Sequence, residues 1–423
     1  MKLVRAATAL LLVVGAASLS AQQPGRPLTL SREEQAAIAA LQTAAASPDR
    51  AAQDAALAAA RTAARGADAR YAIAHYQLEI SRARGDYAAQ AQAVDAIVDS
   101  GLATPEELPS LLANQLSRAY SANDMARVER LMARTVELQP NNVAALADYA
   151  QYKSRVRSPV TGAADRLLSV SLFGRAIDAA EAAGRPAPES VYRRALTVAF
   201  DATQRINGAP PLAPQVAPQA ILFGQKLVAA YPTPVNWRDA LLAYRDLAPS
   251  DPALALDIRR LMRAADALGG EREYLEFAGL LGTAGLHGEA KALLDEGVAR
   301  GVLDPGKPAI AAAVAAATRQ AAAGRAALPG LRTRAAAGTG AQAVAAGDAF
   351  FAYGQYPEAA TLYAAALQKQ GEDPNLINSR LGAALALAGR GPEAAAALQA
   401  VTGPRADLAH YWLTWLAHRP AAT

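Results

Sequence analysis

The side chains best able to do chemistry are four histidines, and their spacing does not bring them together. His75 and His287 are isolated in the sequence. His410 and His418 lie eight residues apart, whereas zinc proteases that carry two histidines on one helix space them four apart, with a glutamate beside the first. The chain has no cysteine, which excludes disulfides, thiolate metal sites and a thiol nucleophile. We therefore expect no metal site and no cofactor.

One group of polar residues could still form an active site. His75, Glu79 and Arg82 are four and three residues apart, so they share one face of a helix, although such triples are common on any solvated helix. Glu33 and Glu34 lie where a helix is expected to begin, and acids favour that end of the helix dipole. The sequence contains no nucleophile elbow and no phosphate-binding loop. We expect that the chain is not an enzyme. The alternative is an enzyme or enzyme subunit with an active site at His75, Glu79 and Arg82.

The elements that must position these side chains are helices. The chain has 423 residues and 112 alanines. Alanine is the best helix former and a poor strand residue. The residues are 52% hydrophobic but only 5% aromatic, which suits thin layers of paired helices better than one wide core. Apolar segments of about 14 to 18 residues, separated by short turns of glycine, aspartate and proline, predict an all-α array of helical hairpins.

Two helix starts can be placed from their capping residues. Ser31 and Glu34 form a capping box, in which each side chain accepts a hydrogen bond from the backbone of the other. Ser47 followed by Pro48 predicts a second start, because serine caps helices and proline suits the first helical position.

The first 21 residues have the organisation of a secretory signal peptide. Lys2 and Arg5 precede an apolar run at residues 9–17, and small residues at 18–21 lead to a cut before Gln22. The run is too short to span a membrane. An uncleaved anchor is the alternative, because Leu19 is larger than the residue usually found there. We expect a periplasmic bacterial protein that is not a lipoprotein, since the chain has no cysteine to acylate.

The charges do not suggest a nucleic-acid partner. The formal net charge is +4, and a nucleic-acid surface needs basic residues clustered on one face. The arginine pairs at 155/157, 193/194, 259/260 and 332/334 are read as solvated helix faces among acids.

A repeat is clearest near the C-terminus. Residues recur after 35 positions: Gly347, Phe350, Gly354, Tyr356, Ala359, Tyr363 and Ala366 return as Gly382, Leu385, Gly389, Gly391, Ala394, Leu398 and Val401. In this pattern the chain resembles the tetratricopeptide repeat (TPR) family, whose 34-residue unit is a helical hairpin with small residues where the two helices touch. The resemblance implies an α-solenoid of seven to nine antiparallel hairpins that form a right-handed superhelix, with close helix contact at Gly347 and a turn at Gly354.

The resemblance also implies a concave groove lined by the first helix of each hairpin. Carried onto this sequence, the groove positions are His75, Glu79, Arg82, Tyr120, Gln151, Arg155, Arg238, Arg245, Asp246, Arg272, Asp348 and Phe351. Most of their charges are arginines, so the groove is expected to hold an acidic peptide, unless the arginines pair with acids of neighbouring helices. The positions near the C-terminus are more apolar.

Proline and glycine divide the chain. After the leader, residues 22–206 are expected to form an N-terminal array, and residues 220–327 a middle array. Residues 207–219 hold four prolines, which predicts an extended loop or linker, and residues 328–340 predict a second break. Residues 341–423 are expected to form a repeat pair and a capping helix, whose Trp412 and Trp415 cover an open apolar face or mediate self-association.

We thus expect a non-enzymatic scaffold of the bacterial cell envelope that binds a protein or peptide partner, in envelope assembly or polymer export.

Overall fold

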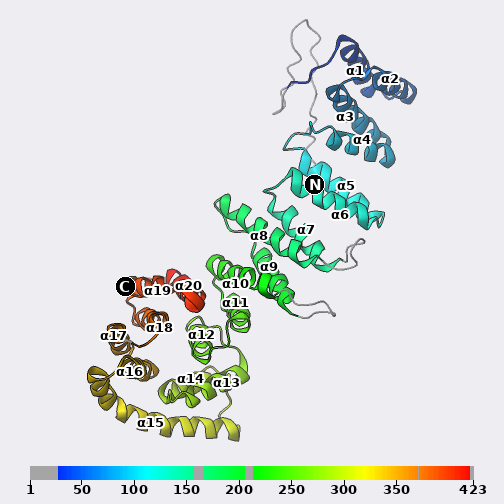
Figure 1. Cartoon of the computed structure of the whole chain (residues 1–423). Helices are drawn as coiled ribbons and strands as arrows, with labels where there is room; N and C mark the ends of the chain where they lie inside the picture. The colour runs from blue at the N-terminus through cyan, green and yellow to red at the C-terminus, as the bar shows by residue number, and fades with distance from the viewer. Residues whose placement is uncertain (1–26, 157–164, 205–212, 370, 420–423) are drawn as a thin grey trace. The chain divides into compact units, whose positions relative to one another are not determined.

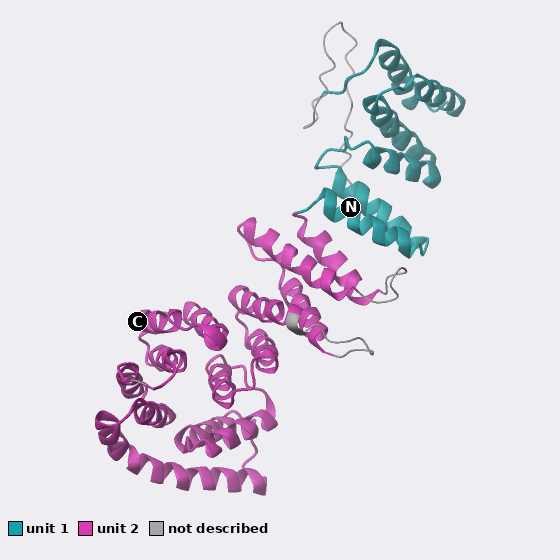
Figure 2. Ribbon diagram, viewed as in Figure 1, with its two compact units in different colours: residues 1–140 teal, residues 141–423 magenta. Residues whose placement is uncertain are grey.

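The computed structural model describes residues 27–156, 165–204, 213–369 and 371–419. Within these ranges the chain is α-helical without β-strands, and consecutive helices pack on one another, which confirms the predicted α-solenoid of hairpins (Figure 1). It forms two compact units, residues 1–140 and 141–423 (Figure 2). The predicted leader, residues 1–21, lies outside the described residues, and the handedness of the superhelix stays a prediction.

The first unit is three helical hairpins. Leucine, isoleucine and valine at three- and four-residue spacing, such as Ile38 and Leu41, or Val94 and Ile97, pack between the helices. The helices are α1 (Arg32–Ala45), α2 (Arg50–Ala63), α3 (Ala67–Arg84), α4 (Tyr87–Asp99), α5 (Leu108–Ser121) and α6 (Met125–Leu138).

The capping box at Ser31 is confirmed, and its glutamate does more than cap. Glu34 is buried and accepts hydrogen bonds from the backbone N–H of Ser31, Arg65 and Gly66, so it ties the start of α1 to the turn before α3. The expected cap at Ser47 is wrong. Asp49 caps α2 instead, because its carboxylate accepts from two backbone N–H groups of the first turn.

Replacing Glu34 by glutamine is expected to make the first unit less stable at neutral pH. Backbone hydrogen bonds from Gly66, Ser31 and Arg65 hold the pKa of Glu34 at about 2, below its ordinary value of 4.5. A depressed pKa stabilises the fold above pH 4.5, and this stabilisation is lost as the pH falls towards 2. Thermal unfolding followed by circular dichroism should therefore show a gap between wild type and Glu34→Gln at pH 7 that closes near pH 2. The exposed neighbour is the control: a similar gap for Glu33→Gln would contradict the assignment.

The second unit contains the remaining helices. They are α7 (Val143–Arg155), α8 (Arg166–Ala182), α9 (Glu189–Thr203), α10 (Ala213–Ala230), α11 (Pro234–Leu247), α12 (Pro252–Ala264), α13 (Gly270–Thr283), α14 (His287–Ala299), α15 (Pro308–Ala337), α16 (Gly340–Ala352), α17 (Tyr356–Leu367), α18 (Pro374–Leu387), α19 (Gly391–Gln399), the 3-10 turn η1 (Gly403–Arg405) and α20 (Ala406–Ala417).

The two predicted interruptions differ from the structure. Helix α10 begins at Ala213 and includes Pro218, so residues 213–219 are helical, while residues 207–212 lie outside the described ranges. Helix α15 runs through Pro329 to Ala337 and removes most of the break expected at 328–340. Each proline costs its helix one backbone hydrogen bond. Packing outweighs that cost, because α10 packs on α9 and α11, and α15 on α14 and α16.

The predicted repeat is confirmed in the hairpins α16–α17 and α18–α19. At Gly347 a Cβ atom would lie 2.6 Å from the ring of Tyr363, and at Gly382 it would lie 2.5 Å from Leu398. Gly354 makes the turn of the first hairpin with φ 71°, a left-handed conformation that favours glycine. The glycines therefore have the two roles that the resemblance implied.

Gly382→Ala is expected to lower the free energy of unfolding by about 1 to 3 kcal/mol, the usual cost of overpacking a core. The added methyl group would meet the buried side chain of Leu398 and, at 3.4 Å, the carbonyl oxygen of Ala394. Urea unfolding checks this. Gly391→Ala, where a Cβ atom meets nothing within 4 Å, is the control and should cost nothing. Equal stability of the two variants would contradict close packing at Gly382.

The last helix, α20, closes the second unit on itself. It packs on α18 and α19, and also on α10 (Figure 1). The Tyr411 ring lies 6.1 Å from that of Trp237 and 5.5 Å from that of Tyr244, both in α11. Trp412 and Trp415 are buried within the same unit, so they do not offer the surface that self-association through this helix requires.

Candidate functional site

The predicted groove residues are divided between the two compact units. His75, Glu79, Arg82 and Tyr120 belong to the first compact unit, and the other eight belong to the second: Gln151, Arg155, Arg238, Arg245, Asp246, Arg272, Asp348 and Phe351. Within each unit, the surroundings of these residues differ.

His75 has a different partner from the one expected. Its Nε2 atom lies 3.7 Å from Oε1 of Glu107, and its ring packs edge-on against Tyr71, whose hydroxyl donates to Glu107 at 3.0 Å. Burial lowers the pKa of His75, while Glu107 opposes the shift and Arg82 adds to it. Glu79 makes no hydrogen bond or ion pair with His75 in the described residues. The structure thus shows no direct contact between His75 and Glu79 in support of the alternative active site at His75, Glu79 and Arg82.

Glu107 was not among the predicted site residues, and it also has a structural role. It exchanges hydrogen bonds with Thr104 in the manner of a capping box before α5. The Thr-x-x-Glu spacing that shows this is visible in the sequence. The contact of Glu107 with α3 depends on tertiary packing and is not visible in the sequence.

Three of the five arginines expected to bind an acidic peptide, Arg238, Arg245 and Arg272, pair with acids of the chain. Arg238 makes two hydrogen bonds of 2.5 and 2.6 Å with the carboxylate of Glu273. Arg245 pairs with Asp246 at 2.8 Å, and Arg272 with Glu276 at 2.6 Å. Of these pairs, Arg238 in α11 with Glu273 in α13 matches the alternative left open by the sequence, in which the arginines pair with acids of neighbouring helices, whereas the other two pairs lie within one helix.

Asp348 and Phe351 contact side chains of their own unit where an open concave groove was predicted. Asp348 accepts hydrogen bonds from Arg380 at 2.7 Å and from the Tyr363 hydroxyl at 2.6 Å. Phe351 is 4% exposed, and the guanidinium of Arg260 lies 4.3 Å from its ring centre. Both residues face the inside of the second unit, because α20 and α12 cover the face that would be concave in an open array.

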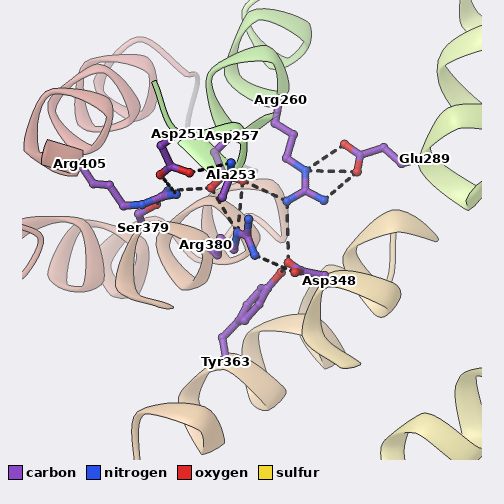
Figure 3. A network of polar contacts seen from close by, with 10 residues as sticks. All are labelled: Asp251, Ala253, Asp257, Arg260, Glu289, Asp348, Tyr363, Ser379, Arg380 and Arg405. Carbon is purple, nitrogen blue, oxygen red and sulfur yellow. Dashed lines mark hydrogen bonds and ion pairs between the residues drawn. The ribbon is translucent and has the colours of Figure 1, made fainter. Parts of the chain in front are cut away.

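A buried network of charges joins the helices there (Figure 3). At its centre, the Asp257 carboxylate of α12 forms ion pairs with Arg405 at 2.7 Å, Arg380 at 3.2 Å and Arg260 at 3.2 Å. Arg260 also binds Glu289 of α14 at 2.8 Å. Arg380 and Arg405 are 123 and 148 residues from Asp257 along the chain, so the network connects the middle of the chain to its end.

The network is closely packed, and Arg405 also pairs with the half-exposed Asp251 at 3.3 Å. Three buried arginines (Arg260, Arg380 and Arg405) face the carboxylates of Asp257, Glu289 and Asp348. Burial acts to raise the pKa of Asp257, but the three arginines outweigh it and the pKa is lowered. A cavity beside it of about 10 Å³ has room for one water molecule. This arrangement can hold helices together, and it leaves no space for a substrate.

A surface groove runs along α14 and α15. It consists of two hollows of about 470 and 540 Å³ that share Asp295, and we call them together the α14–α15 groove. The smaller hollow is mostly apolar and is lined by Asp295, Val298, Ala299, Pro305, Ala311, Val314 and Ala315. The larger hollow is lined by the aromatic residues Phe351, Tyr353 and Tyr356, the cations Arg263, Lys291 and Arg325, the carboxylates Glu289 and Asp295, and smaller residues such as Thr318 and Ala322. Arg263 pairs with Glu296 and Lys291 with Asp295, so Arg325 is the lining cation without an ion pair in the described residues.

Tyr353 fixes the floor of the larger hollow. Its hydroxyl donates to the carbonyl oxygen of Ala321 at 2.8 Å. Glycines on both sides leave room for the ring: a Cβ atom on Gly288 would lie 2.7 Å from it, and one on Gly324 would overlap the hydroxyl. The guanidinium of Arg325 lies 5.3 Å from the centre of the same ring. An aromatic floor with cations at its edge is typical of protein-binding sites.

Another hollow, of about 630 Å³, lies beside α7 and α9. Its lining is more polar and includes Asn141, Asn142, Asp148, Arg185 and Arg194. It has a single tyrosine and no aromatic floor, so we rank it below the α14–α15 groove as a partner site.

Two searches of the described residues bear on other kinds of site. They contain no group of histidine, aspartate or glutamate side chains placed to hold a metal ion. Among them, no helix combines the length and the apolar character needed to cross a bilayer.

Comparisons with known proteins add little. No protein-family model matches the chain, and no curated protein sequence matches it. Among solved structures, a chain from "Structure of Naa15/Naa10 bound to HypK-THB" aligns at 14% identity with a TM-score of 0.26. The alignment covers 88% of this chain, which spans 65% of the length of that one. At this score the likeness carries no argument about function.

Proposed function

We propose that the chain is a non-enzymatic scaffold of the bacterial cell envelope that holds a partner protein in the α14–α15 groove. The observation that carries the proposal is the groove itself, whose hollows of about 470 and 540 Å³ combine small apolar walls with an aromatic floor and cationic edges. Sites of this size and composition bind side chains of a partner.

The place in the envelope rests on the N-terminal sequence. Residues 1–21 have the charged start, apolar run and small residues of a secretory leader, so the mature chain would begin at Gln22 in the periplasm. A scaffold there would hold proteins together during envelope assembly or polymer export. Fractionation and N-terminal sequencing test this part: a chain that stays in the cytoplasm with Met1 in place would contradict it.

Blocking the groove tests the scaffold. Ala315 lines the smaller hollow and is exposed, so Ala315→Trp should fill it. Ala327 is also exposed on α15 and lines neither hollow, so Ala327→Trp is a matched control. Proteins retained from an envelope extract by wild type and by the control, but not by Ala315→Trp, would support the proposal. If Ala315→Trp retained the same proteins as wild type, the groove would not be the binding site.

A further inference from the structure

Helix α15 carries unpaired positive charge. It contains Arg319, Arg325, Arg332 and Arg334, and the sequence has no acidic residue between Asp304 and Asp348. All four arginines are exposed, and none of them has an ion pair within the described part of the chain. The sequence analysis places Arg332 and Arg334 among acids, and for this pair that interpretation is wrong.

The arginines lie on different sides of α15. The buried seam of this helix is Ile310, Ala317, Ala321, Leu328 and Ala335, spaced by seven and four residues. Each residue turns the helix by about 100°, so Arg325 and Arg332, each four after a seam residue, lie about 40° from the seam on the same side. Arg325 lines the α14–α15 groove, so this is the groove side. Arg334, one residue before Ala335, lies on the other side.

The walls of the groove are built for close approach by another helix. Small residues form part of both walls: Ala292 and Ala299 on α14, and Ala311, Ala315 and Ala322 on α15. The two acids of the lining have partners, Asp295 in Lys291 and Glu289 in Arg260. From Ala311 to Arg325 the groove extends about 21 Å, at 1.5 Å per residue, which is about four helical turns. Helices with small residues at the contact pack with their axes close together.

We infer that the partner presents an acidic amphipathic helix, which lies along α14 and α15 and places carboxylates on Arg325 and Arg332. This inference rests on the proposed scaffold function and names the chemistry of its partner. The apolar face of the helix would contact Val298 and Val314, which line the smaller hollow. Arg325 is held beside Tyr353 and keeps its N–H donors free for a carboxylate. Arg332 extends the cationic edge by two turns.

A designed peptide tests the inference. The probe is a fluorescent alanine- and leucine-based helix of about 18 residues, because shorter helices are marginal in water. Its leucines form one face, flanked by glutamates, and a second peptide has glutamine at every glutamate position. Binding to the purified full chain is measured by fluorescence anisotropy at about 0.15 M salt, where long-range charge effects are screened. We expect the glutamate peptide to bind on the order of tenfold more tightly, a difference of about 1.4 kcal/mol.

Charge reversal on α15 locates the effect. Arg325→Glu and Arg332→Glu should each weaken binding of the glutamate peptide several-fold and leave the glutamine peptide unaffected, whereas Arg334→Glu should change neither. An equal loss in all three variants would mean a general charge effect and would overturn the inference. So would equal affinity for both peptides, or binding to phosphatidylglycerol vesicles that depends on Arg325 as strongly as peptide binding does.

The outcome separates this inference from the proposed function. A partner that is captured from extract and lost with Ala315→Trp, but is unaffected by Arg325→Glu, would keep the scaffold and refute the acidic helix. If Ala315→Trp still retained the partner and Arg325→Glu still bound it as wild type does, both the scaffold function and the acidic helix would be refuted.

Discussion

Asp257→Asn is expected to lower the free energy of unfolding of residues 141–423 by about 3 to 5 kcal/mol, the usual cost of removing one partner from a buried ion pair. Asp257 is 4% exposed, and its carboxylate forms ion pairs with three arginines. Asparagine has nearly the same shape but no charge, so Arg380 and Arg405 would lose the carboxylate that compensates their burial. This loss would loosen the contact between α12 and the C-terminal helices.

Tryptophan fluorescence during urea unfolding measures this effect. All three tryptophans of the chain, Trp237, Trp412 and Trp415, lie in the second unit, so their signal reports on that unit. Asp295→Asn is the control, because Asp295 pairs with Lys291 four residues away on an exposed helix face, where a pair contributes at most about 0.5 kcal/mol. If Asp257→Asn cost no more than this control, the network would not hold the unit together.

Trp412→Ala is expected to cost about 3 to 5 kcal/mol, as do other substitutions of large buried aromatic residues by alanine. Trp412 is 1% exposed, and its ring meets that of Trp415 edge to face at 5.2 Å. It also lines the small cavity beside Asp257 and Arg380, so its loss would leave a void between α20 and the charge network. We expect α20 to become the part of the unit most easily detached.

Two measurements check this prediction. Guanidinium unfolding gives the loss of stability, with Val235→Ala as the control at a side chain that is 54% exposed. Limited proteolysis should release a C-terminal fragment containing α20 from Trp412→Ala sooner than from wild type. Equal protection of α20 in both proteins would contradict its role in closure.

The parts of the fold that the sequence predicts are those that depend on neighbouring residues. The 35-residue spacing of Gly347 and Gly382 predicts two hairpins, because close contact and turn formation both take place within one repeat. The box of Ser31 and Glu34 is equally local. Pro218 and Pro329 show the limit: locally they favour a break, but packing of α10 and α15 on their neighbours maintains both helices.

The site depends on contacts that the sequence pattern does not contain. Asp348 occupies a groove position in the repeat, and only the return of α12 and α18 towards it shows that it is buried. The sequence predicts a capping helix with Trp412 and Trp415, but the repeat pattern does not contain the packing of α20 on α10 and α11. The absence of acids around Arg325 is different, since it can be read directly from residues 305–347. Pairs of arginines, such as those at 332 and 334, do not show this absence, because it extends over a whole helix.

Closure by α20 has a consequence for the order in which the chain can fold during synthesis. Most helical arrays fold by adding each new hairpin to the previous one, since contacts are confined to neighbours. Here α12 buries Asp257 with Arg380 and Arg405, which are made 123 and 148 residues later. Until those residues emerge, Asp257 lacks two of its three arginine partners, and burying its charge would be costly. The second unit thus reaches its native packing only when the chain is almost complete.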